Sequence, residues 1–353
     1  MKHVKFNYEK NYVDDFINFH KKLYLRDNTE NEKEVRLLLT NKHALSKYFR
    51  LDKFIIYNND TVVGRFAITT YPDDTTAYLG FFECTDDKRV AKYLFDVVHQ
   101  FAKKNNYTNI VGPVDSSFWI KYRLKINMFN KKPYTGEPYN KKYYLRMFLD
   151  NNYRVVEHYT SNIYKMVNYD YINEKYSKRY KEFIEKGYKI VSPQLSEFDE
   201  IIDKIYDLIT NLYSDFPIYK KISKEDFIEI FKNYKKIINL SMFKIAYFND
   251  KIVGFFISVP NYSNCVYNLS INNLLKIMKI KNNPKEYVML YMGVDRQHTG
   301  LGKAIVQSII LELKKSGLTS IGALTRDGKI TQNYVEDMIK DRYEYVLLEK
   351  NIV

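Results

Sequence analysis

A glutamine and two glycines stand close together in the stretch VDRQHTGLGKAI, which runs from Val294 to Ile305. Gln297, Gly300 and Gly302 lie between an apolar, strand-like run and a segment with the apolar periodicity of a helix. A glycine-containing loop that opens a helix can bind phosphate, because the first backbone N–H groups of a helix are unpaired and carry partial positive charge. The stretch is therefore a candidate phosphate cradle.

Two other phosphate-binding motifs do not fit this stretch. A Walker A loop requires the pattern GxxxxGK[ST], which the sequence lacks. A dinucleotide fingerprint requires a third small residue at the position of Ile305. The pattern that does fit is Q-x-x-G-x-G.

This pattern and its setting resemble the GNAT superfamily of acyl-CoA-dependent N-acyltransferases, whose motif of Arg or Gln, two residues, Gly, one residue and Gly or Ala wraps the pyrophosphate of coenzyme A. From about Lys186 to Val353 the order of elements also matches. A hairpin is followed by the strand EYVMLYMGV, the pyrophosphate loop, a helix, the strand IGALT, a further helix and the closing strand YEYVLLEK. The resemblance implies that acetyl-CoA, or another acyl-CoA, is the cofactor.

The same resemblance implies roles for individual residues. Backbone groups around Met292 and Val294 would pair with the pantetheine arm, the N–H groups from His298 to Lys303 would hold the pyrophosphate, and Asn333 would contact the cofactor near its sulfur. The implied cofactor-binding set is Met292, Val294, Gln297, His298, Thr299, Gly300, Leu301, Gly302, Lys303 and Asn333.

The chain departs from the family at the general acid. Where the family commonly has a tyrosine that protonates the departing thiolate, seven residues after Asn333, this sequence has Lys340. Tyr334 and Tyr343 are the nearby phenols and the candidates for this role, although a packing role fits each of them equally well.

The implied reaction is direct attack of a neutral amine on the thioester, without a covalent enzyme intermediate. No GxSxG elbow is present, which agrees with this expectation. Glu286, at the head of the strand, and Asp295, in the loop, are candidate bases, and both also fit as solvated surface carboxylates.

A second observation concerns the whole chain, because one pattern occurs twice. FIIYNNDTVVGRFAITTY (residues 54–71) and FKIAYFNDKIVGFFISVPNY (residues 243–262) both predict hairpins with an Asn-Asp turn and a following Val-Gly pair. Each copy is preceded by a strand and two helices and followed by a strand and a helix. The sequence predicts an α/β protein with mixed sheets, made of two tandem GNAT-like domains. The expected boundaries are residues 1–166, a linker at 167–186, and residues 187–353.

The two copies differ at the loop. Where the second copy has its glycines, the first reads FFECTDDKRVAKYL, with Glu83, Asp86 and Asp87 and no glycine. Acidic side chains repel phosphate. The N-terminal domain is therefore expected to be a degenerate copy that has lost cofactor binding.

The end of the first copy, residues 112–148, combines turn residues with many aromatic ones. Such a segment suits the wall of a pocket for the acceptor, or a long loop that packs the two domains together. The candidate acceptor-binding residues are Trp119, Tyr122, Arg123, Glu137 and Tyr139.

Composition limits the remaining possibilities. The 353 residues carry a net charge of +14, but the lysines are spread along the chain, so a nucleic-acid partner is not favoured. The densest basic patch, KIMKIKNNPK at residues 276–285, fits a solvated face or a contact with a phosphate-rich cofactor. Cys84 and Cys265 stand far apart without a CxxC motif, and no metal site is expected.

The sequence contains neither a secretory signal nor a stretch long enough to span a membrane. We therefore expect a cytoplasmic protein without a membrane partner. The leading prediction is an N-acetyltransferase that acts on an amine of a small molecule or peptide. Two alternatives stay open at this point: a Fem-like aminoacyltransferase that uses aminoacyl-tRNA, and a non-catalytic acyl-CoA-binding protein.

Overall fold

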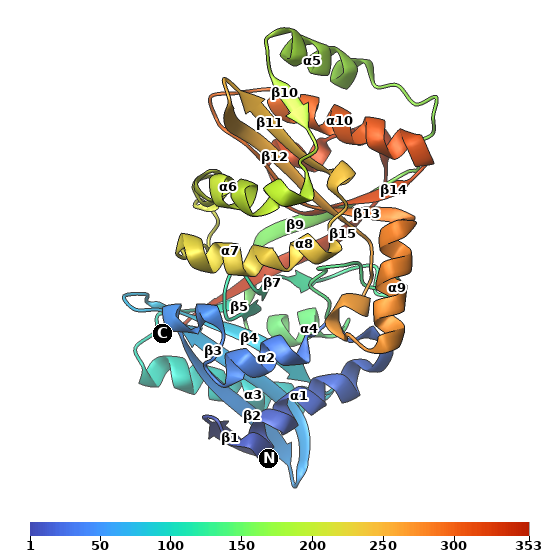
Figure 1. The fold of residues 1–353 in the computed structure, drawn as a ribbon. Coiled ribbons are helices and arrows are strands. Elements are labelled where there is room, and N and C mark those ends of the chain that lie inside the picture. The colour runs from blue at the N-terminus through green and yellow to red at the C-terminus, as the bar shows by residue number, and fades with distance from the viewer. Residues whose placement is uncertain (353) are drawn as a thin grey trace. The chain divides into compact units, whose positions relative to one another are not determined.

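The computed structural model describes residues 1–352, apart from the side chain of Arg26. The chain forms two compact units. Unit 1 contains residues 1–159, 266–268 and the chain from residue 344 onward, and unit 2 contains residues 160–265 and 269–343. Both combine a mixed sheet with helices, which confirms the predicted fold class (Figure 1).

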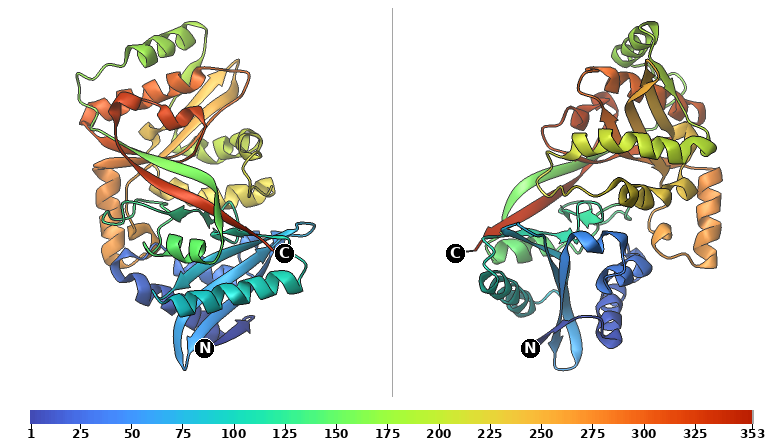
Figure 2. Two further views of the ribbon diagram at one scale, coloured as in Figure 1. Left: turned by 180° about the vertical axis from the view of Figure 1, so that it is seen from behind. Right: turned by 60° about the vertical axis from the view of Figure 1, so that its left-hand side comes forward.

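Unit 1 contains a sheet in the order β1-β2-β3-β4-β5, followed by the last part of β15. The pairs are antiparallel except β4 and β5, which are parallel. Helix α3 covers one face of this sheet, and α1 and α2 lie on the other (Figure 2). The elements are β1 (Lys2–Phe6), α1 (Lys10–Tyr24), α2 (Glu32–Leu39), β2 (Arg50–Asn58), β3 (Thr61–Thr70), β4 (Thr76–Cys84), α3 (Lys88–Lys104), β5 (Asn109–Gly112), β6 (Val114–Asp115), β7 (Lys121–Tyr122), β8 (Leu124–Lys125), α4 (Tyr144–Asp150), β9 (Arg154–Tyr164) and β15 (Ile339–Asn351).

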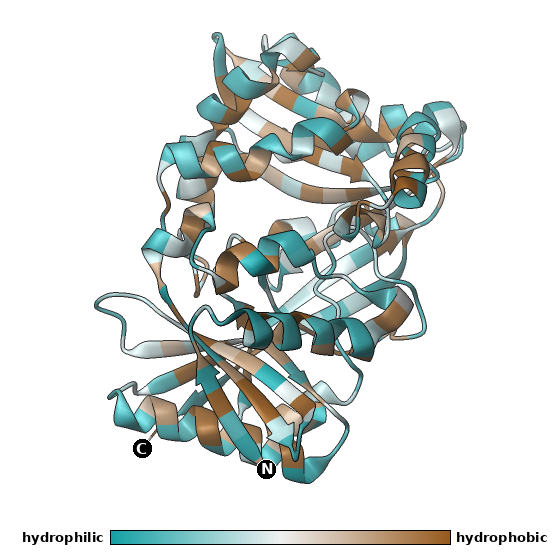
Figure 3. Ribbon diagram, turned by 60° about the horizontal axis from the view of Figure 1, so that its bottom comes forward, coloured by the Kyte–Doolittle hydropathy of each residue, from teal (hydrophilic) through white to brown (hydrophobic). Residues whose placement is uncertain are grey.

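Unit 2 repeats this plan with the order β10-β11-β12-β13-β14 and the final residues of β9 beside β14. Here β13 and β14 form the parallel pair. Helices carry bands of both hydropathies along their length, as expected where one face packs and the other meets water (Figure 3). The elements are α5 (Glu174–Glu185), β10 (Lys189–Val191), α6 (Phe198–Tyr213), α7 (Lys224–Lys232), α8 (Tyr234–Ile237), β11 (Phe243–Phe248), β12 (Lys251–Pro260), α9 (Ile271–Asn282), β13 (Glu286–Val294), α10 (Leu301–Ser316) and β14 (Thr319–Arg326).

Both predicted hairpins are confirmed, and they share an irregularity. In β2–β3 the register shifts after the pair Ile56↔Gly64, and in β11–β12 it shifts after Ala246↔Gly254. The two glycines are those of the repeated Val-Gly pairs. The internal repeat therefore extends to the register of the strands.

Each of these glycines lets a helix approach the sheet closely. A methyl group built on Gly64 would lie 3.3 Å from Leu94 of α3, and one on Gly254 would lie 2.8 Å from Ile305 of α10. Helices α3 and α10 thus rest on equivalent points of the two sheets.

The opposite faces of the two sheets differ in chemistry. The cross-strand pair in unit 1 is Arg65↔Glu83, whereas the corresponding pair in unit 2 is Phe255↔Gly293. Arg65 is fully buried and donates to Glu30 at 2.6 Å. Burial alone would raise the pKa of Glu30, but Arg65 and then His20 outweigh it and hold that pKa at about 2. Unit 1 is built around a buried ionic cluster at a position where unit 2 is apolar.

One predicted element is wrong. The sequence predicts a helix after the strand IGALT, but the chain there forms only two short 3-10 turns, Ile330–Asn333 and Glu336–Met338. Val335, between them, has a left-handed backbone with φ 51°. A β-branched residue in this conformation interrupts the helix that the polar and apolar spacing suggested.

His99 gives a test of the packing of α3. Its ring stacks on Tyr153 at 5.9 Å, and burial followed by repulsion from Lys350 lowers its pKa from 6.5 to about 4. Protons therefore bind the unfolded chain more readily, so that stability is lost as the pH falls from 6.5 to 4. Thermal denaturation of His99→Gln should show a smaller loss of Tm between pH 7 and 5 than the wild type, by roughly 2–4 °C. His158→Gln, at an exposed position, is the control; equal pH profiles for the wild type and the His99 variant would contradict the assignment.

Candidate functional site

The glycine loop of unit 2 is held in place by its own backbone. Asp295 N–H donates to Val253 O of β12 at 2.9 Å, and the Asp295 carboxylate accepts from the N–H of Gln297 at 3.0 Å. His298 N–H closes the turn on Asp295 O at 2.9 Å. The loop therefore leaves β13 in a fixed direction and delivers the chain to α10.

Helix α10 begins without a side-chain cap. Its N-cap residue is Gly300, with φ 94°, a conformation that favours glycine. The N–H groups of Leu301 and Lys303 bond to His298 O and Gly300 O. Within the part of the chain that the structure describes, the N–H groups of Thr299, Gly300 and Gly302 make no hydrogen bond. Three amides at the positive end of a helix are thus left for an external acceptor.

Cations gather at the same end of α10. Lys303 lies in its first turn, and Lys175 and Arg179 approach it from α5. Burial, followed by repulsion from Lys175 and Arg179, lowers the pKa of Lys303. Arg179 also bonds Glu182 at 2.9 Å, and its guanidinium carbon would lie 3.6 Å from a methyl group on Gly300. Positive charge at a helix N-terminus is unfavourable in isolation, so this arrangement favours an anionic ligand.

A small aromatic cluster fixes the middle of the loop. Tyr188 and His298 Nδ1 share a hydrogen bond of 2.7 Å, and Tyr188 stacks on Phe248 at 4.3 Å. The imidazole of His298 meets both rings edge-on. His298 therefore anchors the loop with its side chain.

The strand that leads to the loop has an open edge. β13 pairs with β14 only from Glu286↔Thr319 to Met289↔Gly322, after which Leu324 N–H donates to Ser161 Oγ at 2.9 Å. The pairing of β13 with β12 has a bulge at Leu290. Ile257 pairs with Tyr291 and the next residue, Ser258, pairs with Met289, so that Leu290 has no partner on β12. Most of β13 from Leu290 to Val294 is half-buried. This edge can pair with an extended ligand as an added strand would.

The corresponding slot of unit 1 is filled by the chain itself. β4 and β5 separate after the pair Tyr78↔Val111, and β6 enters the gap. Asp115 accepts a hydrogen bond from Phe81 N–H at 2.5 Å, and a methyl group on Gly80 would lie 1.9 Å from Val114 O. Every residue of β4 after Thr76 is buried. No extended ligand can pair with this strand unless β6 moves.

The helix after this slot is also closed. The loop of unit 1 is only Thr85 to Asp87, and Thr85 N–H bonds Val63 O as Asp295 bonds Val253 O. Asp87 caps α3 by accepting from Arg89 N–H at 2.8 Å, and Asp86 pairs with Arg146. Glu83 takes no part, since it is buried against His20 of α1. Two of the three acidic residues named in the sequence analysis therefore occupy the place of the phosphate cradle.

The two candidate acids have different surroundings in unit 2. Tyr334 lies beside the start of α10, because a methyl group on Gly302 would be 2.6 Å from its hydroxyl oxygen. Burial raises the pKa of Tyr334 to about 12, and the nearby phenol of Tyr176 adds a smaller electrostatic contribution in the same direction. Tyr343 is 4% exposed on β15, and Lys340 is exposed on the same strand. Tyr334 is the phenol that the structure brings to the glycine loop.

Glu286 and Asn333 are each occupied by other residues. Glu286 accepts from Asn261 at 2.6 Å and from Thr319 at 3.2 Å, at the end of β13 opposite the loop. Asn333 is exposed and accepts from Arg342 at 3.2 Å. Glu286 lies four residues, or about 13 Å, along the strand from the bulge at Leu290.

The acceptor candidates all lie in unit 1. Glu137 is 1% exposed and accepts from Lys125 at 2.6 Å and from Tyr345 at 2.8 Å. Burial outweighs these partners and raises the pKa of Glu137. Tyr139 is half-buried, and the ammonium of Lys125 lies 5.0 Å from its ring. A ligand would reach Glu137 only if this network opened.

Trp119, Tyr122 and Arg123 form a separate aromatic group. Arg123 has a left-handed backbone with φ 93°, and its guanidinium stacks 3.7 Å from the Tyr122 ring and 4.3 Å from the Tyr159 ring. Trp119 is half-buried and meets Phe118 edge-on. The structure thus brings Trp119, Tyr122 and Arg123 into one neighbourhood and places Glu137 and Tyr139 in another.

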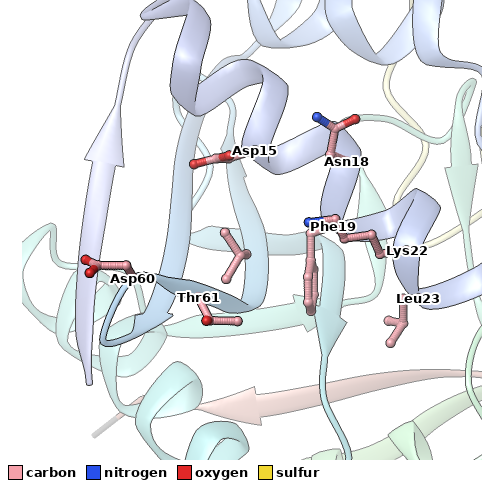
Figure 4. Close-up of a pocket in the computed structure, with 8 residues that line it drawn as sticks. Asp15, Asn18, Phe19, Lys22, Leu23, Asp60 and Thr61 are labelled. Carbon is pink, nitrogen blue, oxygen red and sulfur yellow. The ribbon is translucent and has the colours of Figure 1, made fainter.

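A pocket of about 410 Å³ lies elsewhere in unit 1, between α1 and the β2–β3 turn (Figure 4). None of the predicted site residues lines it. Tyr57 donates to Asp15 at its wall, at 2.7 Å. The lining residues are Asp15, Asn18, Phe19, Lys22, Leu23, Asp60, Thr61 and Val62.

Comparison with known proteins identifies the fold. No family model and no curated protein matches the chain. A tandem GNAT protein from the clavulanic acid biosynthesis pathway, solved without AcCoA, is 9% identical with a TM-score of 0.55, covering 100% of this chain and 98% of that one. A GNAT-family acetyltransferase from Colwellia psychrerythraea is 10% identical (TM-score 0.50; 99% and 100% covered). A GCN5-related N-acetyltransferase from Anabaena variabilis is 8% identical (TM-score 0.51; 100% and 73% covered).

These matches confirm the predicted resemblance to GNAT structures, and the first of them has the tandem arrangement along its whole length. The chain therefore has the fold of a tandem GNAT protein. At 8–10% identity the likeness concerns the fold, and the chemistry has to be argued from the residues of this chain.

Sequence reasoning missed the contribution of α5 to the site. Lys175, Arg179 and Tyr188 lie in or just after the segment predicted as a linker, yet they contact or face the loop before α10. The seven-residue spacing of Tyr176 and Phe183, both buried, is a signal that this segment packs as a helix.

Gly80 tests whether the slot of unit 1 is filled as described. Gly80→Ala places a methyl group against the backbone of β6, which cannot move away as a flexible side chain could. We expect a loss of about 2–3 kcal/mol in the free energy of unfolding, measured by urea denaturation. Gly322→Ala, whose methyl group meets the ring edge of Tyr164 at 3.1 Å, is the milder control. A Gly80→Ala variant as stable as the wild type would mean that β6 does not occupy the slot.

Proposed function

We propose that this chain is an acyl-CoA-dependent N-acyltransferase with one cofactor site, in unit 2. The donor is acetyl-CoA or another acyl-CoA, and the acceptor is an amine of a small molecule or peptide. The observation that carries the proposal is the uncapped start of α10, where free amides and cations meet beside an open strand edge. Unit 1 has the same arrangement of strands and helices, but Asp87 caps its helix α3 and β6 covers the edge of its strand β4.

Each part of the site has a suitable role toward the cofactor. The N–H groups of Thr299, Gly300 and Gly302 donate to the pyrophosphate, and Lys303 and Arg179 balance its charge. The edge of β13 from Leu290 to Val294 pairs with the amide groups of the pantetheine arm. When bound, the cofactor supplies the thioester that carries the acyl group.

The chain's own residues then determine how protons move. The acceptor amine must lose its proton before it attacks, and bulged backbone near Leu290 can polarise the thioester carbonyl. Tyr334 serves as the proton donor for the leaving thiolate, because a phenol whose pKa is about 12 is still protonated at neutral pH. The Glu286 carboxylate accepts from Asn261 and Thr319, and the Asp295 carboxylate accepts from the N–H of Gln297, so water is the better base.

The acceptor-binding residues stay predictions of the sequence. Trp119, Tyr122 and Arg123 provide aromatic faces and one cation, which suit a ligand with an aromatic or acidic group. Glu137 and Tyr139 lie in a separate network around Lys125, so they would meet an acceptor only if that network opened. The cytoplasmic location and the domain boundaries at residues 166 and 187 stay predictions of the sequence.

The loop can be tested by binding. Calorimetric titration with acetyl-CoA should give one site per chain. The double variant Gly300→Glu/Gly302→Glu should bind at least about 100-fold more weakly, because a carboxylate on Gly300 enters the cradle and a side chain on Gly302 displaces Tyr334 beside it. Gly317→Glu is the matched control, since Gly317 has φ 60° and lies at the other end of the same helix.

Two outcomes of this titration would contradict the proposal. Two equivalent sites per chain would mean that unit 1 also binds the cofactor. Undiminished binding in the double variant would mean that the cofactor binds elsewhere. If the wild type bound aminoacyl-tRNA and no acyl-CoA, the Fem-like alternative would replace the proposal.

Tyr334 can be tested by kinetics once an acceptor amine is found. Tyr334→Phe keeps the ring against Tyr176 and removes only the hydroxyl, so kcat should fall about 10- to 100-fold with little change in KM. Tyr343→Phe is the matched control, with kcat near that of the wild type. Equal kcat in wild type and Tyr334→Phe would assign Tyr334 to packing alone.

A further inference from the structure

Helix α9 is an addition to the repeated plan. In unit 1 the strands β3 and β4 are joined by residues 71–75, whereas in unit 2 the corresponding strands β12 and β13 are joined by residues 261–285. The longer connection contains α9, which starts at Ile271. Ser270 caps this helix, because its hydroxyl accepts a hydrogen bond from the N–H of Asn273. The acyltransferase frame repeats without this helix, so α9 calls for an explanation of its own.

The apolar side chains of α9 face outward. The exposed fractions are 78% for Ile271, 45% for Leu274, 61% for Leu275 and 61% for Met278, and Leu269 just before the helix is 62% exposed. No residue of α9 is buried. Single exposed apolar residues are common on protein surfaces, but a row of them along one helix is not.

These residues form one face. At about 100° per residue, Ile271, Leu274, Leu275 and Met278 fall within an arc about 100° wide. The less exposed residues Asn273, Ile277 and Ile280 lie on the other side of the helix. The helix therefore presents a continuous apolar stripe on one side and less exposed residues on the other.

The stripe is bordered by positive charge. Residues 269–285 contain no Asp or Glu, and they include Lys276, Lys279, Lys281 and Lys285. Lys279 and Lys281 flank the stripe on its two sides at the same angular spacing. Lys281 donates to Lys236 O at 2.7 Å. In the described chain, Lys276, Lys279 and Lys285 form no ion pair.

A helix of this length gains little stability alone. Isolated helices shorter than about 12–15 residues are marginal in water, and protein helices depend on packing of their apolar face. α9 has 12 residues and no buried side chain. A partner that covers the stripe would supply the packing that the chain itself does not.

Charge decides which partner fits. A second copy of α9 would place lysines against lysines, with no carboxylate on the helix to compensate. A nucleic acid would match the lysines and leave the apolar stripe in water. An anionic lipid surface matches both, because acyl chains take the stripe while headgroup phosphates meet the flanking ammonium groups.

We propose that α9 is an interfacial helix that docks unit 2 on an anionic lipid bilayer. The stripe from Leu269 to Met278 enters the boundary between headgroups and acyl chains, and Lys279 and Lys281, which flank the stripe, contact the headgroups. None of the helices in the described residues is long and apolar enough to span a bilayer. The prediction of no membrane partner rested on the absence of a spanning segment, and a helix that lies on the membrane surface needs no such segment.

Vesicle co-sedimentation of the full chain tests this proposal. The probes are vesicles of phosphatidylcholine alone and of an equimolar mixture with phosphatidylglycerol. We expect at least tenfold stronger binding to the mixture at low ionic strength, and a loss of this difference as salt shortens the screening length. Lys279→Gln/Lys281→Gln should weaken binding by about fivefold for each lysine, because these two lysines flank the stripe.

The apolar contribution is tested separately. Leu274→Ser/Leu275→Ser keeps every charge and should weaken binding at least about tenfold. The matched controls are Lys103→Gln/Lys104→Gln, which removes the same charge from exposed positions of α3, and Ile172→Ser/Leu195→Ser, which removes exposed apolar residues elsewhere. Unchanged Tm and acetyl-CoA binding in the α9 variants would show that they are folded.

Three results would overturn the proposal. They are equal binding to both vesicle types, full binding by the Leu274→Ser/Leu275→Ser variant, and a concentration-dependent dimer that this variant abolishes. The last would assign the stripe to a second copy of the chain. None of these outcomes depends on acyl transfer, so a failure here is distinct from a failure of the proposed function.

Discussion

Positive charge gathered at the positive end of a helix is the constraint on which the site depends. In unit 2, α10 begins at a left-handed glycine with free amides, and Lys303 stands there beside Lys175 and Arg179. Without an anion these groups repel one another and the helix dipole. Gly300 leaves space beside the start of the helix, whereas the space at Gly302 is filled by the hydroxyl of Tyr334. The packing of α5 on α10 holds Lys175 and Arg179 near this end of the helix. The electrostatic cost in the free protein becomes binding energy when an anion arrives.

Unit 1 shows how the same frame can be closed. The hairpin bulge, the glycine beneath the helix and the bond from the loop to β3 or β12 are all repeated. In unit 1, however, the Asp87 carboxylate caps α3 by accepting from the N–H of Arg89. The Asp115 carboxylate, between β4 and β5, accepts from the N–H of Phe81 in the bulged part of β4. The protein thus supplies in unit 1 the anion and the strand-like partner that unit 2 reserves for a ligand. Arg65 and Glu83 are both buried in unit 1, at the positions where unit 2 has Phe255 and Gly293.

Sequence patterns predicted the elements better than the site. The two hairpins, the order of strands and helices, and the loop from Asp295 to Gly302 follow from local signals: turn residues, alternation and glycine spacing. The helix expected after IGALT was wrong because Val335 adopts a left-handed backbone that its residue type does not announce. The roles of Arg179 and Lys175 escaped because they come from a helix distant in sequence, and the burial of Glu137 depends on Tyr345, more than 200 residues away. Contacts of this kind are set by tertiary structure and leave no local pattern.

Hydrogen–deuterium exchange with and without coenzyme A tests the central claim, that one open and one closed copy of the same frame share this chain. The account predicts slowed exchange in two segments of unit 2, residues 290–294 and 299–303, together with α5, and no change in residues 80–91 of unit 1. Protection at residues 80–91 would contradict it, because the closed copy would then bind the cofactor as well. Exchange in unit 2 that coenzyme A leaves unchanged would equally contradict it, since the amides before α10 would not be the ones that the ligand engages.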